Sequence, residues 1–118
     1  MDRFEVYNHI KDYYNIEPDF PWVKYPQYAV FRHQRNKKWF ALIMNIKRNT
    51  LKIDGEGTAD VINLKTDPLF IGSLQQKAGV LPAYHMSKKS WVTVLLDGSF
   101  DKQELFCLID ESFNLTQK

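Results

Sequence analysis

The stretch "WFALIMNIK", residues 39–47, decides the fold. Nearly all of its residues are apolar, and side chains along a strand point alternately to opposite faces of the sheet. This alternation predicts one face with Phe40, Leu42, Met44 and Ile46, and another with Trp39, Ala41 and Ile43. A strand that is apolar on both faces is typical of the middle of a sheet that is covered on both sides. We therefore expect a central strand, covered on both faces for part of its length.

Other strand patterns lie on either side of this stretch. In chain order they are "YAVFRH" (28–33), "ADVINLK" (59–65), "YHM" (84–86) and "WVTVLL" (91–96). The first is joined to the central strand by the polar turn "QRNKK" (34–38), and "SKKS" (87–90) is short enough for a tight hairpin. Short polar connections favour antiparallel pairing.

Three segments carry helix signals. The first is residues 2–14, which has a broad apolar face. The second is residues 66–80, where Asp67 can cap, Pro68 fits the first helical position and Gly79 fits the end. The third begins near Asp101, with Glu104 completing a capping box. Its expected buried face is Leu105, Leu108, Ile109 and Phe113.

The order of these segments predicts an α+β protein. Three prolines exclude a helix from "IEPDFPWVKYP" (16–26), which we expect to be an ordered loop. The chain lacks the strand–helix–strand alternation that would indicate a parallel sheet. We expect one domain, residues 1–118, in which three helices pack on a twisted antiparallel sheet.

Composition narrows the class of protein further. The chain has a single cysteine, Cys107, which excludes an internal disulfide and fits a reducing cytoplasm. Its neighbours Leu105 and Leu108 suggest a buried structural thiol. The N-terminus is charged, and the longest apolar runs are far too short to span a bilayer. We therefore expect a cytoplasmic protein without a membrane contact.

Catalytic and metal-binding patterns are weak. The chain has no phosphate-binding loop and no cysteine pair, and His9, His33 and His85 fall on three different elements. Asp110 and Glu111 are adjacent and point to different sides of a helix, as on a solvated face. We expect a protein that is not an enzyme, binds no cofactor and folds without metal.

Charge is distributed unevenly, although the net charge is only +2. Between Phe20 and Ile53 there are eight basic residues and no acidic residue. Those in or beside the two turns of this region are Arg32, Arg35, Lys37, Lys38, Lys47, Arg48 and Lys52. Such turns could contact the phosphates of a nucleic acid. Basic residues also keep hairpin loops soluble and sheet edges unpaired, and the sequence leaves both interpretations open.

The stretch "PAYHMSKKSW", residues 82–91, concentrates unusual side chains. In one interpretation Met86 and Trp91 pack beside the sheet while Lys88 and Lys89 occupy an exposed tip. In the other, Tyr84, His85 and Trp91 border a groove in which aromatic faces stack on bases or on a planar ligand, and a lysine meets an anion. The two interpretations differ in whether the aromatic side chains are exposed.

The same stretch also resembles part of a known protein family. Continued through "VTVLLDGSF" to residue 100, and together with "NLKTDP" (63–68), "LIDESFNL" (108–115) and the upstream "FPW", "YAVFRH" and "KKWFALI", it resembles the MmcQ/YjbR family of small bacterial proteins over almost the whole chain. The sequence departs from the family pattern at Ser90, where members often carry His, and at Phe113, where they often carry Tyr.

The resemblance implies a fold related to the frataxin-like and secretion-chaperone-like group, with a proposed double-wing DNA-binding motif. We therefore expect a non-catalytic DNA-binding module with little sequence specificity. Its phosphate contacts are expected from the basic turns, joined by Lys88 and Lys89. The alternative is a module that binds a small planar ligand or a protein at the Tyr84–Trp91 corner. In either case we expect a monomer or a weak dimer.

Overall fold

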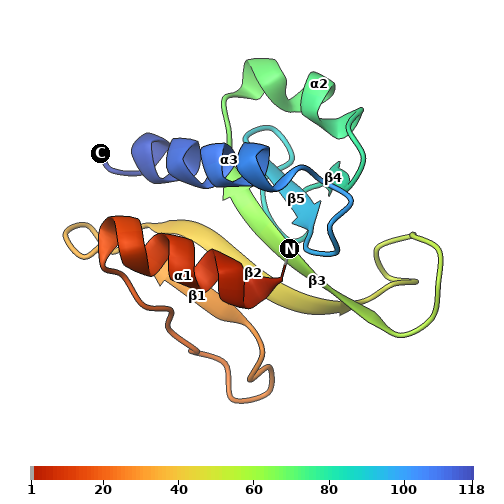
Figure 1. Ribbon diagram of the computed structural model, residues 1–118, viewed down its shortest axis with the longest axis horizontal. Coiled ribbons are helices and arrows are strands. Elements are labelled where there is room, and N and C mark those ends of the chain that lie inside the picture. The colour runs from red at the N-terminus through yellow and green to blue at the C-terminus, as the bar shows by residue number, and fades with distance from the viewer. Residues whose placement is uncertain (1) are drawn as a thin grey trace.

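The computed structural model describes residues 2–118 and confirms a single α+β domain (Figure 1). The helices are α1 (Arg3–Tyr14), the 3₁₀ helix η1 (Pro68–Phe70), α2 (Ile71–Gln75) and α3 (Lys102–Leu115). The strands are β1 (Ala29–Arg32), β2 (Trp39–Lys47), β3 (Thr58–Lys65), β4 (Val80–Pro82) and β5 (Trp91–Leu95). They form one sheet in the order β1-β2-β3-β5-β4, and every neighbouring pair is antiparallel.

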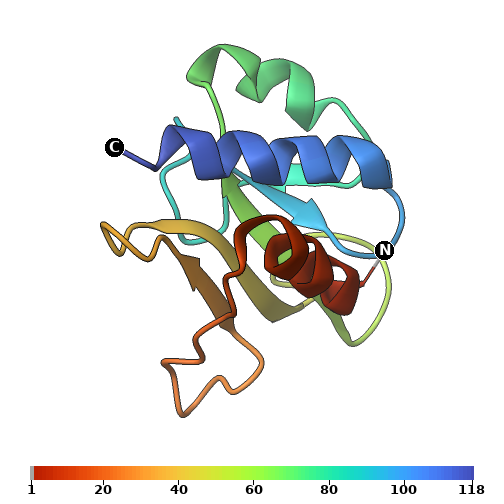
Figure 2. The ribbon, with the colours of Figure 1, turned by 60° about the vertical axis from the view of Figure 1, so that its left-hand side comes forward.

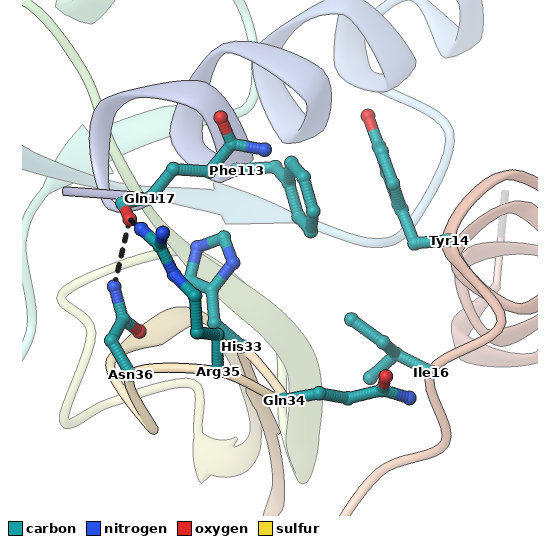
Figure 3. Close-up of a pocket in the computed structure, with 8 residues that line it drawn as sticks. All are labelled: Tyr14, Ile16, His33, Gln34, Arg35, Asn36, Phe113 and Gln117. Atoms are coloured by element: carbon teal, nitrogen blue, oxygen red, sulfur yellow. Dashed lines mark hydrogen bonds between the residues drawn. The ribbon is translucent and has the colours of Figure 1, made fainter.

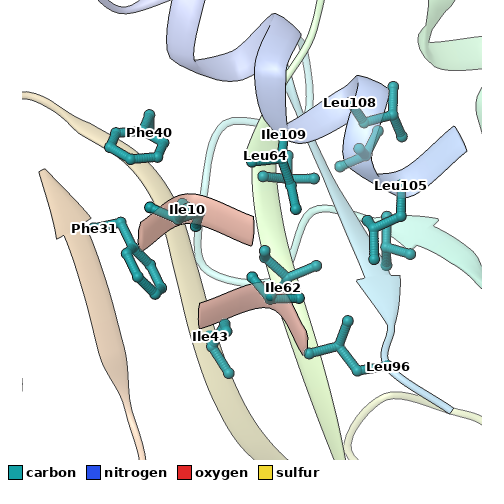
Figure 4. Close-up of a cluster of buried hydrophobic side chains, with 14 of the residues drawn as sticks. Ile10, Phe31, Phe40, Ile43, Ile62, Leu64, Leu96, Leu105, Leu108 and Ile109 are labelled. Atoms are coloured by element: carbon teal, nitrogen blue, oxygen red, sulfur yellow. The ribbon is translucent and has the colours of Figure 1, made fainter. Parts of the chain in front are cut away.

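Helices α1 and α3 lie side by side over one face of the sheet (Figures 1 and 2). Ile10 of α1 and Ile109 of α3 are fully buried against that face, which contributes side chains such as Ile43 and Ile62 (Figure 4). Burying a large aliphatic side chain stabilises a fold by about 1.5–3 kcal/mol. This layer is the main core.

Aspartates cap the starts of α1 and α3, and the capping box predicted at Asp101 is confirmed. The Asp2 side chain accepts a hydrogen bond from the Glu5 amide at 3.0 Å, and α1 ends at Asn15, which adopts a left-handed conformation. The Asp101 side chain accepts from the Glu104 amide at 2.9 Å. Both aspartates satisfy amide donors that the first turn of a helix leaves without partners.

The helix predicted over residues 66–80 is much shorter than expected. Asp67 does cap the start of this segment, the 3₁₀ helix η1, since its side chain accepts from the Leu69 amide, but the α2 helix that follows ends at Gln75. Within α2 only Leu74 is buried, and Gly72 weakens the helix from inside. A segment without a continuous apolar face gains too little from packing to extend its helix. Gly79 instead takes a φ of +84° in the turn before β4.

The predicted faces of β2 are wrong at its start. Phe31 pairs with Ala41 while Arg32 pairs with Trp39, so Phe40 is an extra residue in the ladder. This β-bulge interrupts the alternation. Phe40 consequently packs with Ala41 in the helix-side core instead of joining Leu42 on the opposite face.

Ser112 of α3 supports the bulge. Its hydroxyl donates to the Phe40 carbonyl at 2.6 Å and accepts from the Lys65 amide at 2.9 Å. Ser112 is completely buried, so these two bonds satisfy backbone groups of β2 and β3 at the place where the ladder is irregular.

The extended segment predicted at residues 84–86 is also wrong. The strand is Val80–Pro82, and it ends at a proline, which has no amide hydrogen to continue a ladder. His85 has a φ of +61°, which is incompatible with a strand. The Tyr84 carbonyl accepts from the Asn63 side chain at 2.7 Å, so after β4 the chain turns over the sheet.

A second apolar cluster lies on the sheet face opposite α1 and α3. Its strand residues include Leu42, Met44 and Val61, and loop side chains such as Trp22 and Tyr84 cover them. The prediction that β2 is covered on both faces is therefore confirmed. Within residues 2–118, no helix has both the length and the apolar character needed to cross a bilayer.

Candidate ligand groove and basic turns

A cavity of about 380 Å³ lies on the sheet face away from the helices. Two loops approach each other there, one carrying Tyr25 and Tyr28 and the other Tyr84 and His85, and the end of β2 contributes Lys47. We call this cavity the tyrosine groove; Asn45, Ile46 and Thr50 complete its lining. It combines aromatic walls with polar residues, among them Lys47 and His85.

Two tyrosines of the groove stack on each other, and one of them is half exposed. The rings of Tyr25 and Tyr28 stack with centroids 4.7 Å apart and an angle of 17° between their planes. Tyr25 is 51% exposed. Burial raises the pKa of Tyr28, and the nearby phenols of Tyr84 and Tyr25 raise it further, so its hydroxyl stays neutral near pH 7. Planar, uncharged rings suit stacking.

Tyr84 is held in place by a buried polar network. Its amide donates to the Thr93 hydroxyl at 2.9 Å, and that hydroxyl donates to the Asn63 side-chain oxygen. The Asn63 amide group donates back to the Tyr84 carbonyl. Asn63 and Thr93 have no exposed surface. The network therefore fixes the backbone that presents Tyr84 and His85, whose rings lie 4.0 Å apart.

Trp91 does not join these two residues in the groove. It begins β5 opposite Lys65, whereas Lys47 pairs with Thr58 at the other end of β3. The Trp91 side chain is half-buried. Of the three residues predicted for a ligand site, the structure brings together Tyr84 and His85.

The basic turns lie far apart. The β1–β2 turn, residues 34–38, and the loop after β2, residues 48–57, are at opposite ends of β2 (Figure 1). Eight residue steps of about 3.3 Å along this strand separate them by roughly 26 Å. Lys88 and Lys89 come just before Trp91, at the same end of the sheet as the 34–38 turn. The basic residues do not converge on one surface.

At the 34–38 end, several cations are already engaged. Arg35 donates to the Gln117 carbonyl at 2.8 Å, and the Lys38 ammonium donates to the Lys118 carbonyl. Arg32 lies 3.2 Å from an Asp19 carboxylate oxygen, with its guanidinium 5.8 Å from the Trp39 ring. Three residues that were predicted to contact phosphates are therefore bound within the protein. Lys37, Lys88 and Lys89, by contrast, are exposed.

At the other end, Lys47 and Lys52 are exposed, and Lys47 lines the groove. Arg48 is partly engaged, because its Nε donates to the Asp54 carbonyl at 3.0 Å. Lys47 is therefore the one residue of the predicted basic set that lines the tyrosine groove.

Three predictions for α3 need correction. Cys107 is exposed, because at 100° per residue it lies about 200° around the helix from Leu105, outside the buried stripe. Asp110 is not simply solvated: it accepts from Tyr14 Oη at 2.7 Å and lies 3.0 Å from His9 Nε2. Glu111 likewise accepts from the Thr66 hydroxyl at 2.8 Å. Both carboxylates tie α3 to neighbouring segments.

Comparison with known proteins decides the family. The sequence profile of the YjbR family matches residues 11–115. The chain belongs to the YjbR family. It is 41% identical over 117 residues to the Bacillus subtilis (strain 168) protein named "Uncharacterized protein YyaQ", covering 99% of both chains. It is also 40% identical over 53 residues to the Escherichia coli (strain K12) protein YjbR, covering 44% of this chain and 45% of that one.

Solved structures share the YjbR fold. A crystal structure of a Pseudomonas syringae protein superposes with a TM-score of 0.96 at 46% identity, covering 99% of this chain and all of that one. A Deinococcus radiodurans protein described as a DUF419 domain has a TM-score of 0.74 at 24% identity, covering 99% and 79%, and shows the fold alone. The resemblance drawn from residues 63–68, 82–100 and 108–115 is thus confirmed.

Proposed function

We propose that this protein is a non-catalytic, cytoplasmic DNA-binding module that holds a strand with unpaired bases and has little sequence specificity. A base stacks in the tyrosine groove, and the phosphates on either side meet Lys47 and Lys52. The observation that carries the proposal is the position of Lys47, which lines the aromatic groove and also begins the basic loop after β2.

The groove has the properties that such a site needs. Its volume of about 380 Å³ is sufficient for one base, since ligand pockets usually measure about 300–1,000 Å³. Stacking of a base on an aromatic side chain contributes about 1–3 kcal/mol and tolerates any base. Lys47 and Lys52 lie within one short segment, so one strand could reach both.

Dependence of binding on strand length tests this proposal. Fluorescence anisotropy of a labelled thymidine oligonucleotide is measured, with competition by thymidine monophosphate and by a duplex. We expect the single strand to bind more tightly than the mononucleotide, because it adds a second phosphate contact, and more tightly than the duplex, whose bases are not available to stack. Absence of binding at low salt, or equal binding of duplex and single strand, would contradict the proposal.

A second candidate function uses the same groove for a small planar anion. The favouring observation is that polar residues of two segments, Lys47 and Thr50 on one and His85 on the other, line a cavity the size of a small ligand. In this case the mononucleotide or another planar anion would bind as tightly as the strand. The affinity would also respond weakly to salt, since a single exposed charge pair is involved.

A further inference from the structure

A second cavity, of about 380 Å³, lies on the helix side of the molecule, far from the tyrosine groove. It is formed where the end of α1, the β1–β2 turn and the last turn of α3 meet (Figure 3). Tyr14 and Ile16 line it from one side, His33 and Arg35 from the other, and Phe113 from above. We call it the His33 pocket.

The aromatic wall of the His33 pocket is rigid. The rings of Tyr14 and Phe113 stack with centroids 3.8 Å apart and 14° between their planes. The Tyr14 hydroxyl is held by Asp110, and Phe113 also packs on Phe40 with centroids 5.0 Å apart. A wall fixed in this way loses little conformational freedom when a ligand binds.

His33 provides a hydrogen-bond acceptor inside the pocket. The residue is only 6% exposed, and its Nε2 lies 2.7 Å from the Thr116 hydroxyl. That hydroxyl donates to the Ser112 carbonyl at 2.8 Å, so it must accept from His33, and Nε2 carries the proton. The other ring nitrogen, Nδ1, faces the cavity (Figure 3). In the neutral ring Nδ1 carries a lone pair.

The surroundings keep this imidazole neutral. Burial has the largest effect and lowers the pKa of His33; a hydrogen bond with the Phe113 backbone opposes it, and the positive charges of Arg35 and Lys38 add to the lowering. A deprotonated Nδ1 accepts a hydrogen bond and does not donate one. A ligand group that meets it must therefore carry an N–H or O–H.

Arg35 provides a positive charge at the entrance of the His33 pocket. One of its terminal nitrogens donates to the Gln117 carbonyl, which holds the side chain beside the pocket. A guanidinium has five donors, so this bond leaves others to meet a carboxylate. The pocket thus presents an acceptor inside, a flat aromatic side and a positive charge at the entrance.

We propose that the His33 pocket binds a small aromatic acid whose ring carries a hydroxyl group. The hydroxyl donates to His33 Nδ1, the ring packs against Phe113, and the carboxylate pairs with Arg35. The site is separate from the tyrosine groove, and the proposal does not depend on the function proposed for that groove.

The test compares three probes that differ by one group each: 4-hydroxybenzoate, benzoate without the hydroxyl, and phenol without the carboxylate. Binding is followed by ¹H–¹⁵N correlation spectra of the histidine ring nitrogens, with backbone amide shifts to locate the site. We expect 4-hydroxybenzoate to shift the Nδ1 signal of His33 at millimolar concentrations. Loss of one neutral hydrogen bond should make benzoate roughly three- to tenfold weaker.

The variant Arg35→Gln keeps an amide N–H for the Gln117 carbonyl but removes the charge. It should weaken 4-hydroxybenzoate roughly tenfold or more and leave phenol unchanged. Lys89→Gln, which removes a charge outside the pocket, is the matched control and should change neither. Equal affinity for the three probes, no shift at His33, or shifts confined to Tyr84 and His85 would each overturn the proposal.

Discussion

The buried network beneath the tyrosine groove gives the sharpest prediction about how the fold supports the site. The variant Thr93→Val preserves the shape of the side chain and removes its hydroxyl. That hydroxyl accepts from the Tyr84 amide and donates to the Asn63 side chain, and Thr93 and Asn63 are fully buried. The change therefore leaves the Asn63 side-chain oxygen without this partner in a fully buried place, and the Tyr84 amide without this partner in a partly buried one.

The expected loss of stability follows from these two groups. A buried polar group without a partner costs about 1–3 kcal/mol, and the partly buried Tyr84 amide falls at the lower end of this range, so we expect Thr93→Val to lower the free energy of unfolding by about 2–4 kcal/mol. With a urea m-value of about 1.5 kcal/mol/M for a chain of this length, the midpoint falls by roughly 2 M. The Tyr84 backbone loses an anchor as well, so ligand binding in the tyrosine groove should weaken.

Urea unfolding followed by circular dichroism measures the effect. The matched control is Thr93→Ser, which retains the hydroxyl and loses one methyl group, at a cost of about 0.8 kcal/mol. Equal midpoints for the Val and Ser variants, or a Val variant within about 0.5 kcal/mol of wild type, would refute the role given to the network.

Three further predictions concern other parts of the chain. Trp91→Ala should lower the free energy of unfolding by about 2 kcal/mol, roughly half the value for a fully buried aromatic, and a thermal melt measures it. Although burial alone would raise the pKa of Asp60, hydrogen bonds from Arg3 and Asn45 lower it. The resulting stability is present above about pH 4 and is lost as the pH falls through the folded-state pKa, so Asp60→Asn should flatten an acid-unfolding curve in that range. Exposed Cys107 should react with a thiol reagent in the native state, and reaction only in denaturant would contradict its exposure.

The elements that the sequence predicted well are those whose signals are local. Asp101 caps α3 through a backbone amide three residues away, so a short window of sequence contains the whole interaction. The bulge at Phe40 is different, because it depends on which residues of β1 pair with β2. No pattern within residues 39–47 reveals that choice. The helix predicted over residues 66–80 had a correct start signal at Asp67 but lacked a continuous buried face, so it ends before Gly79.

The candidate site could be predicted only in part for a related reason. Tyr84, His85 and Lys47 were identified by residue type. The sequence did not show that the loop with Tyr84 and His85 meets the end of β2, where Lys47 lies, because folding brings these two segments together. Tyr25 carried no signal beyond an ordered loop, and Tyr28 none beyond the start of a predicted strand. Cys107 was misjudged because neighbours in sequence were taken as neighbours on a helix face. The count of basic residues identified the two basic turns. It could not show that the whole length of β2 separates them.

The salt dependence of DNA binding tests the proposed function most directly. Each phosphate neutralised on a single strand contributes about 0.7 to the slope of log K against log salt, so contacts by Lys47 and Lys52 predict a slope of roughly −1.4. Anisotropy across a salt series should show that Lys47→Gln and Lys52→Gln each reduce the slope by about 0.7. The matched variants Lys37→Gln and Lys89→Gln, at the opposite end of the sheet, should leave the slope unchanged. A slope near zero for wild type, or a slope reduced only by the Lys37 and Lys89 variants, would contradict binding at the tyrosine groove.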